Sequence, residues 1–257
     1  MSKMIVNRAR FFLVFLLVFF VAAQPVGQAA NVDTSTQATI ADLDNDDTYL
    51  DEVAIVPVND PLEGWNRAVF TFNDAMLDYV ARPLHEGYTT ITPGFMRTGI
   101  SNFFHNLMFP VRFTNNILQG RFRGAGVEMS RFVLNSTAGL GGFIDVAQYK
   151  EPIVPVEDED FGQTLGVWGF GEGIYIVWPV LGPSTARDSF GTVGDYFLSP
   201  ITYVKPDGLS WGLAALRTFN DLDATLDAYD SLKGLAVEPY TAVRDGYIQF
   251  RKAQIAK

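Results

Sequence analysis

The chain has 257 residues, no cysteine and a formal net charge of −10 at pH 7. The lack of cysteine excludes disulfides, thiolate metal sites, a cysteine nucleophile and lipidation of an N-terminal cysteine. An acidic chain without clustered Lys and Arg is a poor nucleic-acid binder, because phosphate contacts need such clusters. Its 21 Phe, 10 Tyr and 4 Trp indicate that some apolar surface faces something other than a core.

Residues 1–29 have the pattern of a secretory signal peptide. A basic start precedes an uncharged apolar run over 11–23, which is shorter than the roughly twenty residues that span a bilayer. Small residues offer cleavage sites at 27–29 and, less well, at 21–23. An uncleaved membrane anchor is the alternative. Residues 30–59 are acidic, contain no Lys or Arg, and are expected to form a disordered tether.

The folded domain is expected over 60–251, with a C-terminal tail at 252–257. Its first helix is predicted at 62–81, with Asp60 as N-cap, Glu63 completing a capping box, and Arg82-Pro83 as the end. Apolar residues at helical spacing predict further helices over 92–107, 111–118 and 124–137. The glycine-rich block at 138–147 then indicates a turn.

The second half begins with a predicted loop at 148–160. It ends in the acidic run 157–160, which is expected to be solvated, since the ligand spacing of a calcium-binding EF-hand is absent. Within 161–181, residues 173–178 are expected to form a short strand or an extended wall. Helices are predicted at 209–232, with Gly234 as C-cap, and at 238–251. Without strand–helix alternation or internal repeats, the fold class is predicted to be all-α.

Residues suited to catalysis are sparse. The segment around Ser184 lacks the second glycine of a nucleophile elbow, and His85 and His105 precede it, opposite to the order in α/β-hydrolases. We therefore expect a loop serine rather than a lipase or esterase. The glycines at 169–173 lack the Lys-Ser/Thr of a phosphate loop. No catalytic residue, cofactor or metal is expected.

A dense apolar cluster lies in the second predicted helix and just beyond it. Positions 103, 104, 107 and 108 are neighbours on a helix. One interpretation is a packed core, and the other is a helix whose apolar face dips into the acyl chains of a membrane. The membrane-facing candidates are Phe103, Phe104, Leu107, Met108 and Phe109.

A series of short motifs runs in order along residues 60–251. They are Asp60-Pro61-Leu62-Glu63-Gly64-Trp65-Asn66-Arg67, Arg82-Pro83, Ser101-Asn102-Phe103-Phe104, Asn116-Ile117-Leu118-Gln119-Gly120, Gly141-Gly142-Phe143-Ile144-Asp145-Val146-Ala147, Phe161-Gly162-Gln163-Thr164-Leu165-Gly166, Arg187-Asp188 and Pro239-Tyr240. This series resembles the MlaA/VacJ family, outer-membrane proteins of Gram-negative bacteria that remove misplaced phospholipids.

The resemblance implies amphipathic helices arranged as a ring in the inner leaflet of the outer membrane, around a central amphipathic pore. It implies phospholipid transport that maintains lipid asymmetry, with outer-leaflet phospholipids passing through the channel to a periplasmic lipid-carrier protein of the Mla pathway. A trimeric porin is the other implied partner, and no covalent chemistry is involved. Many relatives are lipoproteins anchored through an N-terminal cysteine, which this chain lacks. Its attachment would then rest on the helical belt and a protein partner.

The resemblance also assigns the channel or its adjoining loop. The residues are Gly141, Gly142, Phe143, Ile144 and Val146, with Phe72 and Asn73 as weaker candidates for the inner rim. The alternative is a structural turn with Phe143 and Ile144 packed in a core. Two other functional hypotheses stay open: a non-transporting brace of a porin or the envelope, and a phospholipid-degrading enzyme.

Overall fold

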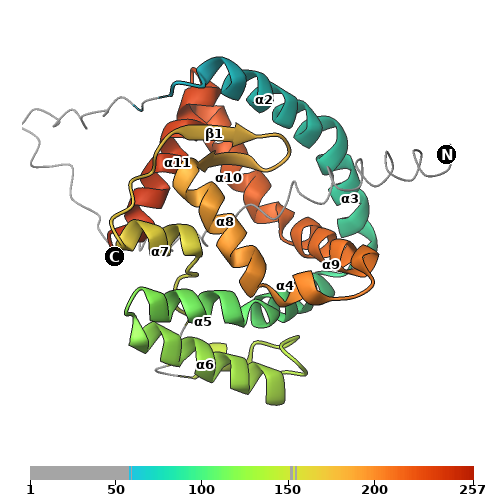
Figure 1. The fold of residues 1–257 in the computed structure, drawn as a ribbon. Helices are drawn as coiled ribbons and strands as arrows, with labels where there is room; N and C mark the ends of the chain where they lie inside the picture. The colour runs from blue at the N-terminus through green and yellow to red at the C-terminus, as the bar shows by residue number, and fades with distance from the viewer. Residues whose placement is uncertain (1–57, 59, 151–152, 154) are drawn as a thin grey trace, which may run out of the picture.

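The computed structural model describes residues 58 and 60–257, apart from 151, 152 and 154 (Figure 1). The predicted signal peptide and nearly all of the predicted tether lie outside these residues. The described part is mostly helical with one small antiparallel hairpin, which confirms the all-α expectation. Its elements are α2 (Glu63–Met76), η1 (Leu77–Ala81), α3 (Arg82–Ile91), α4 (Gly94–Leu107), α5 (Phe109–Leu118), α6 (Phe122–Thr137), η2 (Val146–Tyr149), α7 (Phe161–Val167), β1 (Tyr175–Trp178), β2 (Gly182–Thr185), α8 (Ala186–Leu198), η3 (Pro200–Tyr203), α9 (Asp207–Asn220), α10 (Leu222–Leu235) and α11 (Pro239–Ile255).

The first predicted helix does not end at Arg82-Pro83. It continues through the π-helical turn η1 into α3, with Pro83 in the first turn of α3. A proline inside a helix has no N–H to donate and crowds the carbonyl of the residue four positions earlier. The wider π turn directly before Pro83 provides room for that crowding. The predicted end is therefore a bend in one longer helix.

Asp60 does not cap the first helix. The residue before α2 is Leu62, and no side chain caps that end. Asp60 instead accepts a hydrogen bond from Asn66 Nδ2 at 2.8 Å and another from the Tyr240 hydroxyl. Glu63 pairs with Arg67 at 2.7 Å. The predicted capping box was therefore wrong: Asp60 connects the start of α2 to α11.

Two asparagines attach the hairpin to α2. Asn66 donates to Tyr175 O and accepts from Val177 N, and Asn73 donates to Trp178 O and accepts from Val180 N. They are seven residues apart and so face the same side of the helix. Each amide satisfies both backbone groups of the strand segment it meets, as a neighbouring strand would. The extended segment predicted at 173–178 is thus the strand β1, held by α2.

In the part of the chain that the structure describes, buried apolar side chains form three separate clusters. The first joins α2, β1 and α11 around Val69 and Tyr175, and the second joins η1 and α10 around Leu77 and Leu226. The third surrounds Phe104 and joins α4, α5, η3 and α9. In Figure 1, α5 and α6 lie at the opposite end of the molecule from α2 and the hairpin. Several small cores, rather than one, leave space between the elements for polar side chains.

The C-terminal third departs furthest from prediction. Strand β2 and helix α8 were not predicted, and the helix expected at 209–232 is two helices, α9 and α10, that meet at Asp221. Helix α11 continues through most of the predicted tail to Ile255. Hydrophobic periodicity detects an apolar face but not a break within it, which explains the merged helix.

Candidate functional site

The glycine-rich turn between α6 and η2 lies against α4. Gly141 and Gly142 have φ angles of +72° and +98°, which residues with a side chain rarely adopt. A Cβ on Gly142 would lie 2.4 Å from the Asn106 Cβ. Asn106 itself is buried and donates to Ser136 Oγ at 2.9 Å and Gly141 O at 3.4 Å. Glycine is therefore required at 142 by conformation and by space.

The side chains of this turn divide between the protein and solvent. The ring of Phe143 lies over Gly99 of α4, where even a Cβ would meet it at about 2.1 Å. Ile144 is exposed and Val146 half-buried. Asp145 accepts from Arg131 Nη2 at 2.7 Å and from Asn135 Nδ2 at 2.8 Å. These bonds fix the turn to α6, so the predicted loop is a shaped structure that presents Ile144 outward.

The weaker rim candidates on α2 differ from each other. Phe72 is exposed, whereas Asn73 is buried. The Asn73 amide bonds the backbone at Trp178, the last residue of β1, and at Val180, just after it. Asn73 is accordingly a residue that positions the hairpin. Sequence periodicity placed both residues on the helix but could not show which of them had a partner.

A polar cluster occupies the space between α4, α5 and α6. Arg112 Nε lies 2.9 Å from Glu128 Oε2 and 3.4 Å from Asp158 Oδ1, and its Nη2 lies 3.3 Å from His105 Nδ1. His105 Nε2 lies 3.2 Å from Asp158 Oδ1. Burial alone would raise the pKa of Asp158, but the His105 hydrogen bond and the attraction of Arg112 lower it below its ordinary value. Asp158 therefore keeps its negative charge.

The acidic run 157–160 is only partly solvated, because Glu157 is exposed while the residues after it are paired with the protein. Glu159 is buried and meets Arg121 Nη1 at 2.5 Å, while Asp160 accepts the backbone N–H of Gln163 and so caps α7. Burial raises the pKa of Glu159 to about 7 against the opposing attraction of Arg121. The prediction was wrong for 158–160 because the cations that pair with these residues are distant in sequence. No cluster of three or more potential metal-ligating side chains occurs in the described part of the chain.

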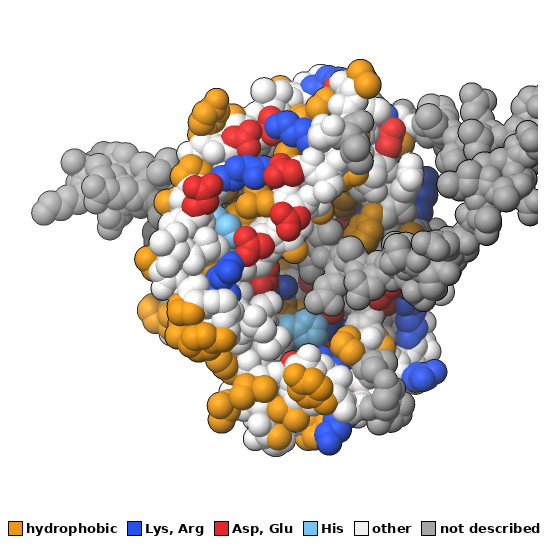
Figure 2. Space-filling view, turned by 180° about the vertical axis from the view of Figure 1, so that it is seen from behind, with side chains coloured by type: hydrophobic (Ala, Val, Ile, Leu, Met, Phe, Trp, Pro, Cys, Tyr) orange, Lys and Arg blue, Asp and Glu red, His pale blue; other side chains and the backbone are white. Residues whose placement is uncertain are grey.

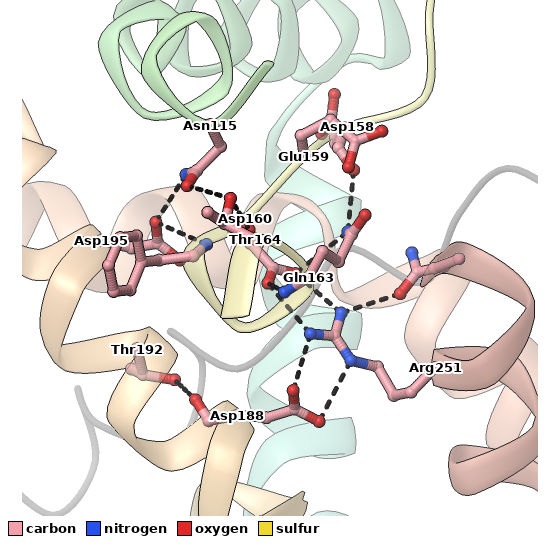
Figure 3. A network of polar contacts seen from close by, with 12 residues as sticks. Asn115, Asp158, Glu159, Asp160, Gln163, Thr164, Asp188, Thr192, Asp195 and Arg251 are labelled. Atoms are coloured by element: carbon pink, nitrogen blue, oxygen red, sulfur yellow. Dashed lines mark hydrogen bonds and ion pairs between the residues drawn. The ribbon is translucent and has the colours of Figure 1, made fainter. Parts of the chain in front are cut away.

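Arg251 of α11 is the centre of a second, fully bonded network (Figure 3). Its Nη1 and Nη2 donate to Asp160, and its Nε and Nη2 donate to Asp188, with all four distances between 2.7 and 3.1 Å. Burial would raise the pKa of Asp188, but hydrogen bonding to Arg251 outweighs it and lowers the pKa. Asp188 also accepts from the hydroxyl of Tyr247 at 2.8 Å. One guanidinium thus joins α7, α8 and α11; we call this group the Arg251 clamp.

Beside the clamp, α7 and α8 approach each other through glycines. A Cβ on Gly191 would lie 2.4 Å from the backbone N of Gly162. Asp195, one turn further along α8, accepts the Phe161 N–H at 3.1 Å and Asn115 Nδ2 at 3.0 Å. Burial and the neighbouring Asp160 raise the pKa of Asp195 to about 7. Sequence reasoning missed this site, although Arg187-Asp188 was among the motifs quoted above.

The five membrane-facing candidates separate into core and surface. Phe104 is 1% exposed, Met108 joins it in the third cluster, and buried Phe109 stacks on Phe132 with ring centroids 4.4 Å apart. These three are core residues, which corrects the membrane-facing expectation. Leu107 packs at the edge of the same cluster, and Phe103 is 38% exposed.

Other apolar side chains are exposed instead. They include Ile91, Phe95, Ile117, Phe122, Met129, Val133, Phe190 and Phe197. Figure 2 shows hydrophobic side chains gathered at the end formed by α5 and α6, and charged side chains across the other end of this face. Patches of exposed apolar surface mark contact with a membrane or a protein. Among the described residues no helix is long and apolar enough to cross a bilayer.

Among the described residues, Ser184 forms no hydrogen bond with either histidine. Its hydroxyl bonds the Thr185 carbonyl at 3.3 Å and lies 3.1 Å from Ser189 Oγ. His85 pairs instead with Asp223 at 2.6 Å. The Ser–His contact that activates a serine nucleophile is therefore not formed at Ser184.

Comparison of this chain with known protein families, sequences and structures agrees with the order of its motifs. The model of the MlaA lipoprotein family matches residues 58–254. The chain is 39% identical over 196 residues to the intermembrane phospholipid transport system lipoprotein MlaA of Escherichia coli, covering 74% of this chain and 76% of that protein. The protein of the same name from Haemophilus influenzae is 33% identical, covering 74% and 77%. A solved structure described as "Structural basis for maintenance of bacterial outer membrane lipid asymmetry" aligns with a TM-score of 0.65 and 34% identity, covering 77% of this chain and 99% of that one. The chain therefore belongs to the MlaA family.

Proposed function

We propose that this protein transports phospholipid and maintains outer-membrane lipid asymmetry. It passes mislocalised outer-leaflet phospholipids through an amphipathic channel to a periplasmic carrier of the Mla pathway. The curated relatives from Escherichia coli and Haemophilus influenzae are named for intermembrane phospholipid transport. The chain sits at the outer membrane on its periplasmic face, where a trimeric porin is its partner.

The proposal rests on one observation: charged side chains lie between the helices, and apolar side chains lie on the surface. Arg112, Glu128 and Asp158 meet between helices, whereas residues such as Phe122 and Phe190 are exposed. Moving two acyl chains through water would cost on the order of 20 kcal/mol at about 0.8 kcal/mol per CH₂. A passive route must shield the chains and solvate the headgroup together. A ring of amphipathic helices around a polar interior meets both needs.

The glycine turn borders this route. The Phe143 ring covers Gly99, and Asn102 Nδ2 donates to Phe143 O at 3.3 Å, so the turn contacts α4 along its length. Because Ile144 stays exposed beside this contact, the turn offers an apolar side chain next to polar helix surface. That combination suits an acyl chain that moves past a headgroup site.

Deleting the gene in its own bacterium tests the proposal. Phospholipid exposed on the cell surface should rise in the deletion strain, return to normal with the wild-type gene, and stay high with Phe143→Arg. A gene carrying Ser184→Ala should return surface phospholipid fully to normal, because no hydrolysis is involved. An unchanged surface in the deletion strain, with the wild-type protein shown to reach the outer membrane, would refute transport and favour a bracing role.

A further inference from the structure

Arg217 lies on the side of α9 that faces α4. Leu213 and Ala214 of α9 pack against the Phe104 cluster, and Asn220 Nδ2 donates to Arg97 O at 2.9 Å. Arg217 is three or four residues from each of these contacts, so it shares their face of the helix. The same face packs against α4, which contributes His105 to the polar cluster, and the charges of Asp158 and Arg112 in that cluster act on Arg217.

The guanidinium of Arg217 has no bonded partner among the described residues. Burial lowers the pKa of Arg217, Asp221 and Asp158 attract it from a distance, and Arg112 repels it. Arg112 differs, because its charge is matched by Glu128 at 2.9 Å. A half-buried cation without a hydrogen-bonded anion is costly. An anionic group from outside the chain would relieve that cost.

Asp158 supplies an opposite charge within electrostatic range of Arg217. Only Oδ1 of its carboxylate contacts His105 and Arg112 among the described residues, and the side chain is 35% exposed. Because Arg112 Nη2 can only donate, His105 Nδ1 accepts from it and His105 Nε2 donates to Asp158 Oδ1. Asp158 thus keeps its charge, and its Oδ2 has no bonded partner among the residues that the structure describes.

We propose that Arg217 and Asp158 together bind the headgroup of a zwitterionic phospholipid, the phosphodiester at Arg217 and the ammonium of ethanolamine at Asp158. The inference rests on the proposed transport function and names its preferred cargo. Arginine presents a planar fork of donors that fits phosphate oxygens. A phospholipid headgroup without an amine would bring a negative phosphodiester near Asp158 and no positive charge to balance that carboxylate. The pair consequently favours phosphatidylethanolamine over phosphatidylglycerol.

The test loads the purified full-length protein in detergent with equal amounts of phosphatidylethanolamine and phosphatidylglycerol and quantifies bound lipid by mass spectrometry. Wild type should retain more phosphatidylethanolamine. Arg217→Gln should weaken retention of both lipids about tenfold, as expected for loss of a charge-assisted bond, and Arg217→Lys should restore part of it. Asp158→Asn should bring the ratio of the two lipids to about one. Asp158→Glu, which keeps the carboxylate, should preserve the preference.

Arg123→Gln is the matched control, because Arg123 is exposed on α6 and its loss removes the same charge. Unchanged thermal unfolding midpoints establish that the variants fold. Soluble glycerophosphoethanolamine should displace lipid from wild type, and inorganic phosphate should not. The inference is overturned if Arg217→Gln retains as much lipid as the wild type, or if Asp158→Asn leaves the ratio of the two lipids unchanged. If wild type itself binds no phospholipid, the proposed transport function fails instead.

Discussion

The Arg251 clamp and the polar cluster around Arg112 contain the same residue types, but they differ in how completely their charged groups are hydrogen-bonded. In the clamp, one arginine satisfies two carboxylates with four hydrogen bonds, and Tyr247 completes the shell of Asp188. In the polar cluster, among the described residues, Asp158 keeps an unbonded oxygen, and Arg217, which feels its charge, has no bonded partner. Complete bonding holds three helices in place. In the polar cluster, the groups that lack hydrogen bonds remain able to bind a ligand.

The largest expected effect is at the clamp. Arg251→Met removes the cation and leaves Asp160 and Asp188 facing each other in a buried site. Breaking a buried pair from one side costs about 3–5 kcal/mol. Urea unfolding followed by circular dichroism should show that loss, whereas Arg217→Gln should show almost none. Comparable losses in the two variants would remove the distinction between the regions.

The pH dependence of stability sharpens the comparison. Asp195, with a pKa of about 7 in the folded protein against 3.8 unfolded, stays protonated where the unfolded chain ionises. The unfolded state then binds fewer protons, so the free energy of unfolding should fall as pH rises from about 4 to 7. Each unit of pKa difference corresponds to about 1.4 kcal/mol.

Asp195→Asn mimics the protonated form and should flatten this decline without removing it, because Glu159 titrates in the same window. Urea denaturation at several pH values checks both slopes, and Asp195→Asn/Glu159→Gln should be flatter still. A wild-type protein whose stability rises steadily from pH 4 to 7 would contradict the assignment.

The glycine turn should respond to single substitutions in a graded way. Gly142→Ala meets both a positive φ and the Asn106 side chain, and should cost about 1–3 kcal/mol. Gly141→Ala meets only the positive φ in open space and should cost less. Thermal unfolding gives the order of the two, and surface phospholipid in complemented cells gives the functional effect. Equal behaviour would mean that Asn106 does not fix the turn.

The smallest stability effect should come from the apolar surface. Phe122 is 73% exposed, so Phe122→Ser should change the unfolding free energy by less than about 0.5 kcal/mol. Membrane association should nevertheless weaken, and combining it with Phe190→Ser should add to the loss. Sedimentation with phospholipid vesicles measures this. A destabilised variant would place Phe122 in a core contact rather than at a membrane.

Local sequence pattern predicted the helices that contain an uninterrupted apolar face, such as α4 and α6, and the turn that requires glycine at 142. It did not predict α8, whose glycines weaken local helix propensity and whose position depends on the close approach of Gly191 to Gly162. The acidic run was misread for a related reason. Asp160 is 91 residues from Arg251, and no local pattern connects them.

The most direct test of the central claim places a photo-crosslinking amino acid at His105, in the polar interior, and at Phe122, on the apolar surface, in living cells. If phospholipid passes through the interior, both positions should capture it, and Arg217→Gln should reduce capture at 105 while leaving capture at 122 unchanged. Capture at 122 with none at 105 would contradict transport through the interior and leave a protein that only rests on the membrane.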